Sequence, residues 1–162
     1  MKLLLENWRK FLNEEIDFTM SLHDFDQTSK GWRSISNEHP EQQAAAMLRY
    51  IEENPDTGGK DPVLLWHLGQ VYAMANNTEQ ALRWIKEANK YEKIPYNKIY
   101  QQFTMYFLSE DVENFNNLYS QHKEQIEADT KDTNIQFVKC MKRCGEANNF
   151  NYKDAYTPEC KC

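Results

Sequence analysis

The chain has 162 residues, an aromatic content of 13%, and only five glycines and five prolines. This length predicts one domain, and the apolar content excludes global disorder. The formal net charge is −6 and no extended cluster of lysine and arginine offsets it, so nucleic acid is not an expected partner, because an acidic surface repels phosphate backbones.

The sequence also argues against a membrane protein. No apolar stretch approaches the roughly 20 residues that a membrane-spanning helix needs. The apolar run of residues 3–5 is followed at once by Glu6, and it is far shorter than the roughly 7–15-residue core of a signal peptide. We therefore expect a cytoplasmic protein without a membrane partner.

The N-terminal third predicts helices separated by an irregular segment. Apolar residues recur at a helical period over residues 3–17, which predicts an N-terminal helix. Residues 20–30 are polar and broken, so we expect a loop that leads to a short helix at about residues 32–35. Pro40 suits a first helical turn and begins an amphipathic stripe that ends at Asn54.

The rest of the chain predicts five more helices. Asp61 is suited to be the N-cap of a helix that begins at Pro62. Thr78 is expected to cap the helix that follows, and Gly145 to close the last one. We expect these helices at residues 62–75, 79–91, 96–108, 112–128 and 134–144, followed by an irregular tail at residues 146–162.

The fold class follows from these elements. No turn dipeptide between alternating apolar runs predicts a β-hairpin. The connections of roughly three to five residues are typical of antiparallel helical pairs. We expect a single all-α domain.

The chain contains an internal repeat. A shift of 34 residues places Trp66 on Tyr100, Tyr72 on Tyr106, Ala81 on Phe115, and Ile85 on Tyr119. The same shift in the other direction places Trp66 on Trp32 and Ile85 on Ile51. Residues of about 28–128 are therefore expected to hold three helical hairpins.

The central unit resembles the tetratricopeptide repeat (TPR) family. The residues that carry the resemblance are Leu68, Gly69, Tyr72, Ala81, Ile85 and Ala88. There are departures: the leading aromatic residue, Trp66, is one position late, the closing Pro95 is two positions late, and Gln102 and Phe103 replace Leu-Gly in the next unit. The resemblance implies a short solenoid of antiparallel hairpins, capped by the helices at 3–17 and 134–144.

The resemblance also implies a binding surface. In this family the first helix of each hairpin lines a concave groove that holds a protein or peptide partner. The matching residues are Trp66, His67, Gln70, Ala73, Met74, Tyr100, Gln101, Thr104 and Phe107. The lysines and asparagines that grip a terminal carboxylate in some repeats are missing, so an aromatic, neutral groove for an apolar or amphipathic peptide is expected. The alternative is that Trp66 and Phe107 belong to the core.

No motif supports catalysis. The four histidines form no metal-binding pair, and the chain has neither a phosphate-binding loop nor a nucleophile elbow. We therefore expect a non-catalytic protein without a cofactor. One alternative function remains open, an acidic inhibitor or immunity-type protein that would bind a basic target through charge complementarity. The exposed end faces of helical hairpins also leave a homodimer open as the oligomeric state.

All four cysteines lie near the C-terminus, at Cys140, Cys144, Cys160 and Cys162. They leave three alternatives. They are unlinked thiols, or a tetrahedral zinc site of four thiolates in a metal-binding regulatory protein, or disulfides such as Cys144–Cys160. A disulfide would require an oxidising compartment.

Overall fold

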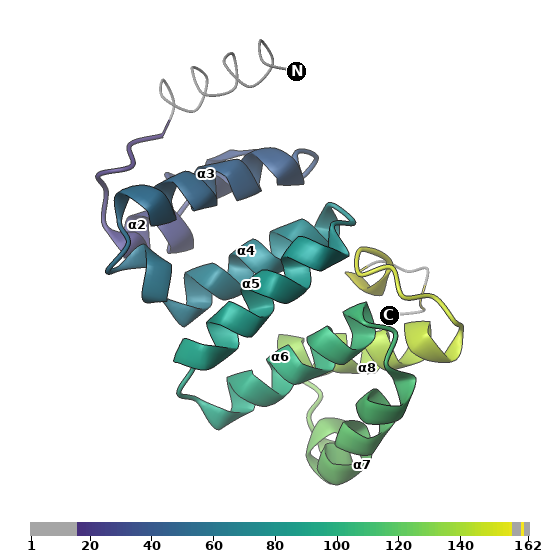
Figure 1. The fold of residues 1–162 in the computed structure, drawn as a ribbon. Helices are drawn as coiled ribbons and strands as arrows, with labels where there is room; N and C mark the ends of the chain where they lie inside the picture. Colours follow the sequence, from purple (N-terminus) through teal and green to yellow (C-terminus); the bar gives the residue numbers. More distant parts are fainter. Residues whose placement is uncertain (1–15, 157–159, 161–162) are drawn as a thin grey trace.

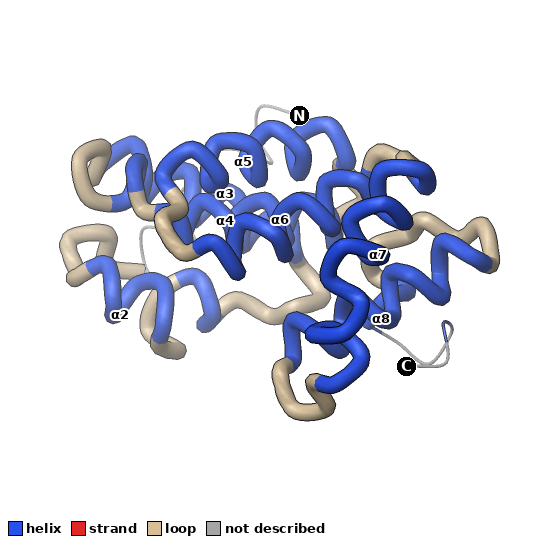
Figure 2. Tube along the Cα trace, turned by 90° about the horizontal axis from the view of Figure 1, so that it is seen from below, coloured by secondary structure: helices blue, strands red, loops and turns tan. Residues whose placement is uncertain are grey.

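The computed structural model describes residues 16–156 and Cys160. The helix predicted at residues 3–17 lies outside them, except for Ile16 and Asp17, which are not helical. The α-helices are α2 Leu22–Gln27, α3 Pro40–Glu53, α4 Pro62–Met74, α5 Thr78–Tyr91, α6 Pro95–Leu108, α7 Val112–Ala128 and α8 Thr133–Glu146. Three 3-10 turns are η1 Trp32–Ser34, η2 Gly58–Lys60 and η3 Asp154–Tyr156. Figure 2 shows no strand among the described residues, which confirms the all-α fold class.

Most of the predicted helix boundaries agree with the structure to within about one or two residues, because local caps fix them. The side chain of Asp61 accepts hydrogen bonds from the backbone N–H of Val63 and Leu64, at 3.0 and 2.8 Å, and so caps α4 as expected. The cap of α5 differs from the prediction. Asn77, and not Thr78, accepts from the N–H of Gln80 at 3.2 Å.

Two other local predictions were wrong. Residues 22–27, predicted as loop, form the short helix α2, in which Ser21 Oγ accepts from the N–H of Asp24 at 3.1 Å. Gly145 does not close α8, which continues to Glu146. The residue with a positive φ after α8 is Asn148, at 56°.

The 34-residue shift reappears in the backbone of two turns. Asn76 and Glu110 both adopt the left-handed conformation, with φ of 57° and 56°. The N–H of Asn77 donates to Tyr72 O, and the N–H of Asp111 donates to Tyr106 O, each at 2.9 Å. Both are Schellman turns that end one helix and lead directly into the cap of the next. The hairpins α4–α5 and α6–α7 therefore share their turn geometry.

Gly69 sets the close packing of α4 against α5. A Cβ at this position would lie 2.6 Å from Cγ1 of Ile85 and 3.2 Å from the carbonyl oxygen of Ala81. A Cβ contact of 2.6 Å does not occur in real structures, so a side chain at this position would force the two helices or Ile85 to shift. Figure 1 shows α5 running beside α4 as a result.

The region predicted as a first hairpin differs from the other two. Over residues 28–54 the only α-helix is α3, which follows the short turn η1. The α2–η1 segment packs below α3: the rings of Phe25 and Tyr50 stack with centroids 4.0 Å apart, and Gln43 Nε2 donates to Ile35 O at 2.9 Å.

Helix α4 lies between two hydrophobic clusters. One face contributes Leu64, Leu68 and Val71 to a cluster with α2, η1 and α3. Another contributes Leu65 and Trp66 to a cluster that α5, α6, α7, α8 and the C-terminal segment complete. The successive helices thus form layers from α3 through α4 and α5 to α6 and α8 (Figure 1).

Candidate functional site

The first two turns of α4 and α6 border an open pocket of about 250 Å³. Helix α4 contributes Pro62, Val63, Trp66, His67 and Gln70. The remaining lining residues are Glu92, Asn97, Tyr100, Gln101 and Asn134. Helical spacing places the α4 residues on one face of that helix, and Asn97, Tyr100 and Gln101 on one face of α6. Glu92 comes from the end of α5 and Asn134 from the start of α8. We call this site the α4–α6 pocket. It is smaller than the roughly 300–1,000 Å³ of pockets for drug-sized ligands, so it suits a side chain or a short turn of a partner.

Glu92 gives this pocket a negative charge. The residue is only 5% exposed. Its Oε1 accepts from the N–H groups of Lys93 and Ile94, both at 2.9 Å, and its Oε2 accepts from Asn97 Nδ2 at 3.1 Å. These three bonds hold the turn between α5 and α6. No basic side chain of the described residues forms an ion pair with it.

His67 is fixed in the wall by a buried carboxylate. Its Nδ1 lies 2.8 Å from Oδ1 of Asp26, which is 2% exposed. Trp32 Nε1 donates to the same oxygen at 2.9 Å, and Gln27 donates to the other. Burial raises the pKa of Asp26, but the hydrogen bonds and charge of His67 and the bonds from Trp32 and Gln27 outweigh it and hold the pKa below its ordinary value.

An ionised Asp26 determines the tautomer of His67. The carboxylate is an acceptor only, so the proton of the ring lies on Nδ1, and Nε2 of a neutral ring is an acceptor. Arg33 contributes a positive charge nearby: its Nη2 is 3.5 Å from both ring nitrogens, and its guanidinium lies 4.2 Å from the centre of the Trp32 ring. The imidazole is therefore held in one orientation.

Of the nine residues of the predicted groove, five meet at this pocket: Trp66, His67, Gln70, Tyr100 and Gln101. Their surroundings are more polar than predicted. The sequence suggested a neutral aromatic wall, whereas the structure adds the Glu92 carboxylate and the amides of Asn97 and Asn134. Trp66 and Tyr100 are largely buried, and their rings meet edge to face at 5.1 Å.

The other predicted wall residues do not reach the pocket. Met74 is half-buried and, like Ala73, packs against the larger cluster. Thr104 is fully buried and donates to Tyr100 O at 3.2 Å. Phe107 is 1% exposed, with its ring 5.6 Å from that of Phe150. Phe107 and Thr104 are thus core residues.

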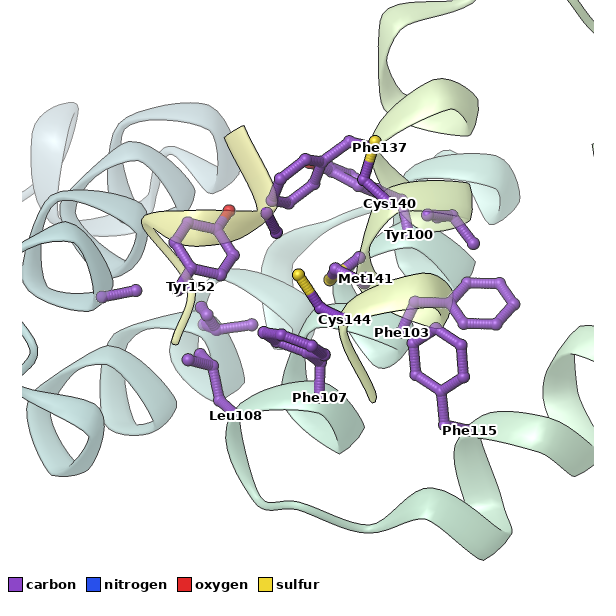
Figure 3. Packing of buried hydrophobic residues seen from close by; sticks show 14 of the residues in the cluster. Tyr100, Phe103, Phe107, Leu108, Phe115, Phe137, Cys140, Met141, Cys144 and Tyr152 are labelled. Carbon is purple, nitrogen blue, oxygen red and sulfur yellow. The ribbon is translucent and has the colours of Figure 1, made fainter. Parts of the chain in front are cut away.

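The C-terminal segment covers the surface beyond Gln70. Gln70 Nε2 donates to the hydroxyls of Tyr152 and Tyr156, each at 3.1 Å. The Tyr156 ring stacks on Phe137 at 3.9 Å. Burial, with a contribution from neighbouring tyrosines, raises the pKa of Tyr100 and Tyr152 well above the ordinary value, so both hydroxyls remain neutral. Figure 3 shows Tyr152 beside the aromatic cluster of α6 and α8.

Two of the cysteines form the disulfide that was one of the three alternatives. Cys144 and Cys160 are bonded, with Cα atoms 5.2 Å apart. Cys140 is disulfide-bonded too, and none of the described cysteines is free. The unlinked alternative is wrong for these residues. Zinc bound by four thiolates would first require reduction, and the described residues contain no other group of side chains suited to a metal ion.

Sequence reasoning missed Asp26, Glu92, Asn97 and Asn134. Asn97 lies one helical turn before Tyr100 and Gln101, so its position on the same face was accessible from the periodicity of α6. Asp26 lies in a segment predicted as loop. Glu92 and Asn134 carried no signal, because acids and amides near helix ends are common.

Comparisons with family models, with curated proteins and with solved structures find no match to this chain. None of the helices within residues 16–156 is long and apolar enough to cross a membrane.

Proposed function

We propose that this protein is a non-catalytic binding module that holds a segment of a partner protein in the α4–α6 pocket. The observation that carries the proposal is the convergence of polar and aromatic side chains from the first helices of two successive hairpins. In the proposed arrangement, α4–α5 and α6–α7 are units of a short TPR-like solenoid, in which α8 follows as a capping helix.

The chemistry of the pocket favours a polar side chain or an exposed peptide group as ligand. Gln70, Asn97 and Asn134 carry amides that both donate and accept hydrogen bonds. His67 Nε2 and the remaining lone pair of Glu92 add acceptors. Trp66 and Tyr100 supply apolar area beneath them. Such a combination of a few oriented polar groups on an aromatic base is typical of binding sites.

Two features place limits on the partner. Val63, which lines the pocket, is 40% exposed, and Ile94, two residues after Glu92 in the chain, is 56% exposed. An apolar residue next to the bound polar group would cover this exposed apolar surface. The Cys144–Cys160 disulfide favours an oxidising compartment over the cytoplasm predicted from the sequence, because cytosolic thiols are kept reduced.

The test is selection of peptides from a random display library against the oxidised protein. Affinities of the selected peptides are then measured by fluorescence anisotropy for wild type, Asn134→Trp and Asn117→Trp. The Asn134 side chain lines the pocket, whereas Asn117 is exposed on α7 and makes a matched control.

We expect Asn134→Trp to weaken binding at least about tenfold, which corresponds to about 1.4 kcal/mol, and Asn117→Trp to leave it unchanged. Circular dichroism confirms that both variants are folded. A library that yields no binder, or binders that Asn134→Trp does not weaken, would contradict the proposal.

A further inference from the structure

A second cavity lies between α6, α7 and α8, on the other side of Tyr100 from the α4–α6 pocket. Its volume is about 150 Å³. The wall is mainly aliphatic and aromatic, formed by Ile99, Phe103, Ile126, Ile135 and Val138. The more exposed Tyr96, His122, Gln125 and Asp129 form a polar rim, and Tyr100 completes the lining. We call it the α6–α7 cavity.

The repeat explains why this cavity exists. Phe103 occupies the position that Gly69 holds in the preceding hairpin, and Tyr119 occupies that of Ile85. Gly69 lets α5 lie directly against α4. The Phe103 ring instead stands between α6 and α7, 5.0 Å from Phe115 and 6.4 Å from Tyr119.

These aromatic contacts hold the second hairpin apart. Figure 3 shows the rings of Phe103 and Phe115 next to each other, in an edge-to-face arrangement, and Figure 1 shows α7 turned away from α6. Space between the diverging helices is then filled only in part by Ile126 of α7 and by Ile135 and Val138 of α8. The cavity is a consequence of replacing a glycine with a phenylalanine at one repeat position.

The size and lining of the cavity indicate its ligand. The cavity is open to solvent at its polar rim, and its volume of about 150 Å³ gives room for a benzene-sized molecule. Aromatic ligands gain edge-to-face contacts with rings such as Phe103 in addition to the burial of apolar area. The wall therefore suits one six-membered aromatic ring.

The rim of the cavity offers hydrogen-bonding groups to a polar substituent of the ligand. His122 is half-buried, and neither its ring nitrogens nor the amide of Gln125 has a hydrogen-bond partner within the described part of the chain. A hydroxyl or amino group on the ring would reach this side of the cavity and find both donors and acceptors. The opposite orientation would bury the polar group among isoleucines at a cost.

We propose that the α6–α7 cavity binds a small molecule with a single aromatic ring and one hydrogen-bonding substituent, with the ring against Phe103 and Ile126 and the substituent at His122. The site is separate from the α4–α6 pocket and does not depend on the function proposed there.

Phenol is the probe for the test, with the full chain in its oxidised form. Nuclear Overhauser effects between phenol protons and the methyl groups of Ile126, Ile135 and Val138 are measured in the wild-type protein. Affinity is compared between wild type and Ile99→Phe, which fills the cavity from α6, and Asn117→Phe, which adds the same ring at an exposed position of α7 that lines neither site.

We expect the three methyl contacts, a loss of affinity of at least about tenfold in Ile99→Phe, and no change in Asn117→Phe. If Ile99→Phe does not fold, the Overhauser contacts of phenol with the three methyl-bearing residues in the wild-type protein test the proposal by themselves. Absence of these contacts, contacts elsewhere only, or equal affinity in a folded Ile99→Phe variant would overturn the proposal.

Discussion

Asp26 and His67 are 41 residues apart in the chain, and Oδ1 of the first lies 2.8 Å from Nδ1 of the second. This contact ties the short helix α2 to α4. It also orients the imidazole of the α4–α6 pocket, so the placement of a pocket residue depends on a buried acid that does not line the pocket.

Replacing Asp26 with asparagine should reduce the free energy of unfolding by about 2 kcal/mol at pH 7, because a hydrogen-bonded buried charge is lost. The folded-state pKa of Asp26 lies below its ordinary value of 3.8. The stabilisation is thus fully present above the unfolded-state pKa and is lost as the pH falls through the folded-state value. Urea unfolding of wild type and variant from pH 7 to pH 3 should show the difference shrinking only in the acid range. Asp56→Asn, in an exposed ion pair, serves as the control and should change little.

Gly69→Ala should destabilise the protein by about 1 kcal/mol. Alanine favours a helix by about 1 kcal/mol over glycine, but overpacking against Ile85 costs about 1–3 kcal/mol and outweighs that gain. Gly59→Ala is the control, since its Cβ would meet only Cγ2 of Ile51 at 3.7 Å. Thermal and urea unfolding of both variants measure the effect. A Gly69→Ala protein as stable as wild type would show that the two helices do not pack this closely.

The cap of α5 can be assigned by a pair of substitutions. Asn77→Ala should cost about 1 kcal/mol of stability, because the N–H of Gln80 loses its acceptor. Thr78→Ala should be close to neutral, since Thr78 is the first helical residue and is exposed. Urea unfolding of the two variants measures the difference in stability. A larger loss in Thr78→Ala than in Asn77→Ala would show that Thr78 is the cap, as the sequence predicted.

Glu110→Asn should stabilise the protein. A left-handed backbone conformation costs most L-residues roughly 1–2 kcal/mol, and asparagine tolerates it better than glutamate. The equivalent residue in the preceding hairpin is already Asn76. An increase in the free energy of unfolding of about 0.5 kcal/mol or more is expected by urea titration, whereas the same change at exposed Glu113, inside α7, should give no increase.

The disulfide closes a loop with a sequence separation of 16 between Cys144 and Cys160. Loop closure of this length contributes about 3 kcal/mol in the chain-entropy description. The oxidised Cys144→Ala/Cys160→Ala variant should therefore unfold at a lower urea concentration than oxidised wild type.

The bond itself can be seen by alkylating the denatured but unreduced protein and measuring its peptides by mass spectrometry. Residues 144 and 160 should appear in one linked species. Alkylated thiols at both positions would contradict the bond, and would return the cysteines to the unlinked or metal-bound alternatives.

Sequence patterns predicted the elements whose signals are local. Asp61 before Pro62 sets the start of α4 wherever the helix later packs. Helix α2 was not predicted because six residues show little periodicity. It packs through Phe25, which stacks on Tyr50 of α3, and this contact between distant segments forms only in the folded protein. Thr104 and Phe107 were predicted to line the groove from repeat spacing alone, and repeat spacing does not show which residues a later segment of the chain will bury.

The same limit applies to the candidate pocket. Trp66, His67, Gln70, Tyr100 and Gln101 follow from helical periodicity combined with the repeat. Glu92 lines the pocket because the turn between α5 and α6 places it there, and this position follows no periodicity. No sequence pattern indicated that Tyr152 and Tyr156 would contact Gln70. Contacts between segments separated by 82 or 86 residues depend on the path of the whole chain.

Helix α4 belongs to both hydrophobic clusters, and this shared membership bears on how the molecule unfolds. If either cluster lost its packing, one face of α4 would be exposed. The helix would then no longer support the packing of the second cluster. The α2–α3 segment and the α5–α8 segment are thereby coupled into one cooperative unit, despite the layered arrangement that would otherwise allow independent local opening. Amide hydrogens of α4 should accordingly exchange at the rate of global unfolding.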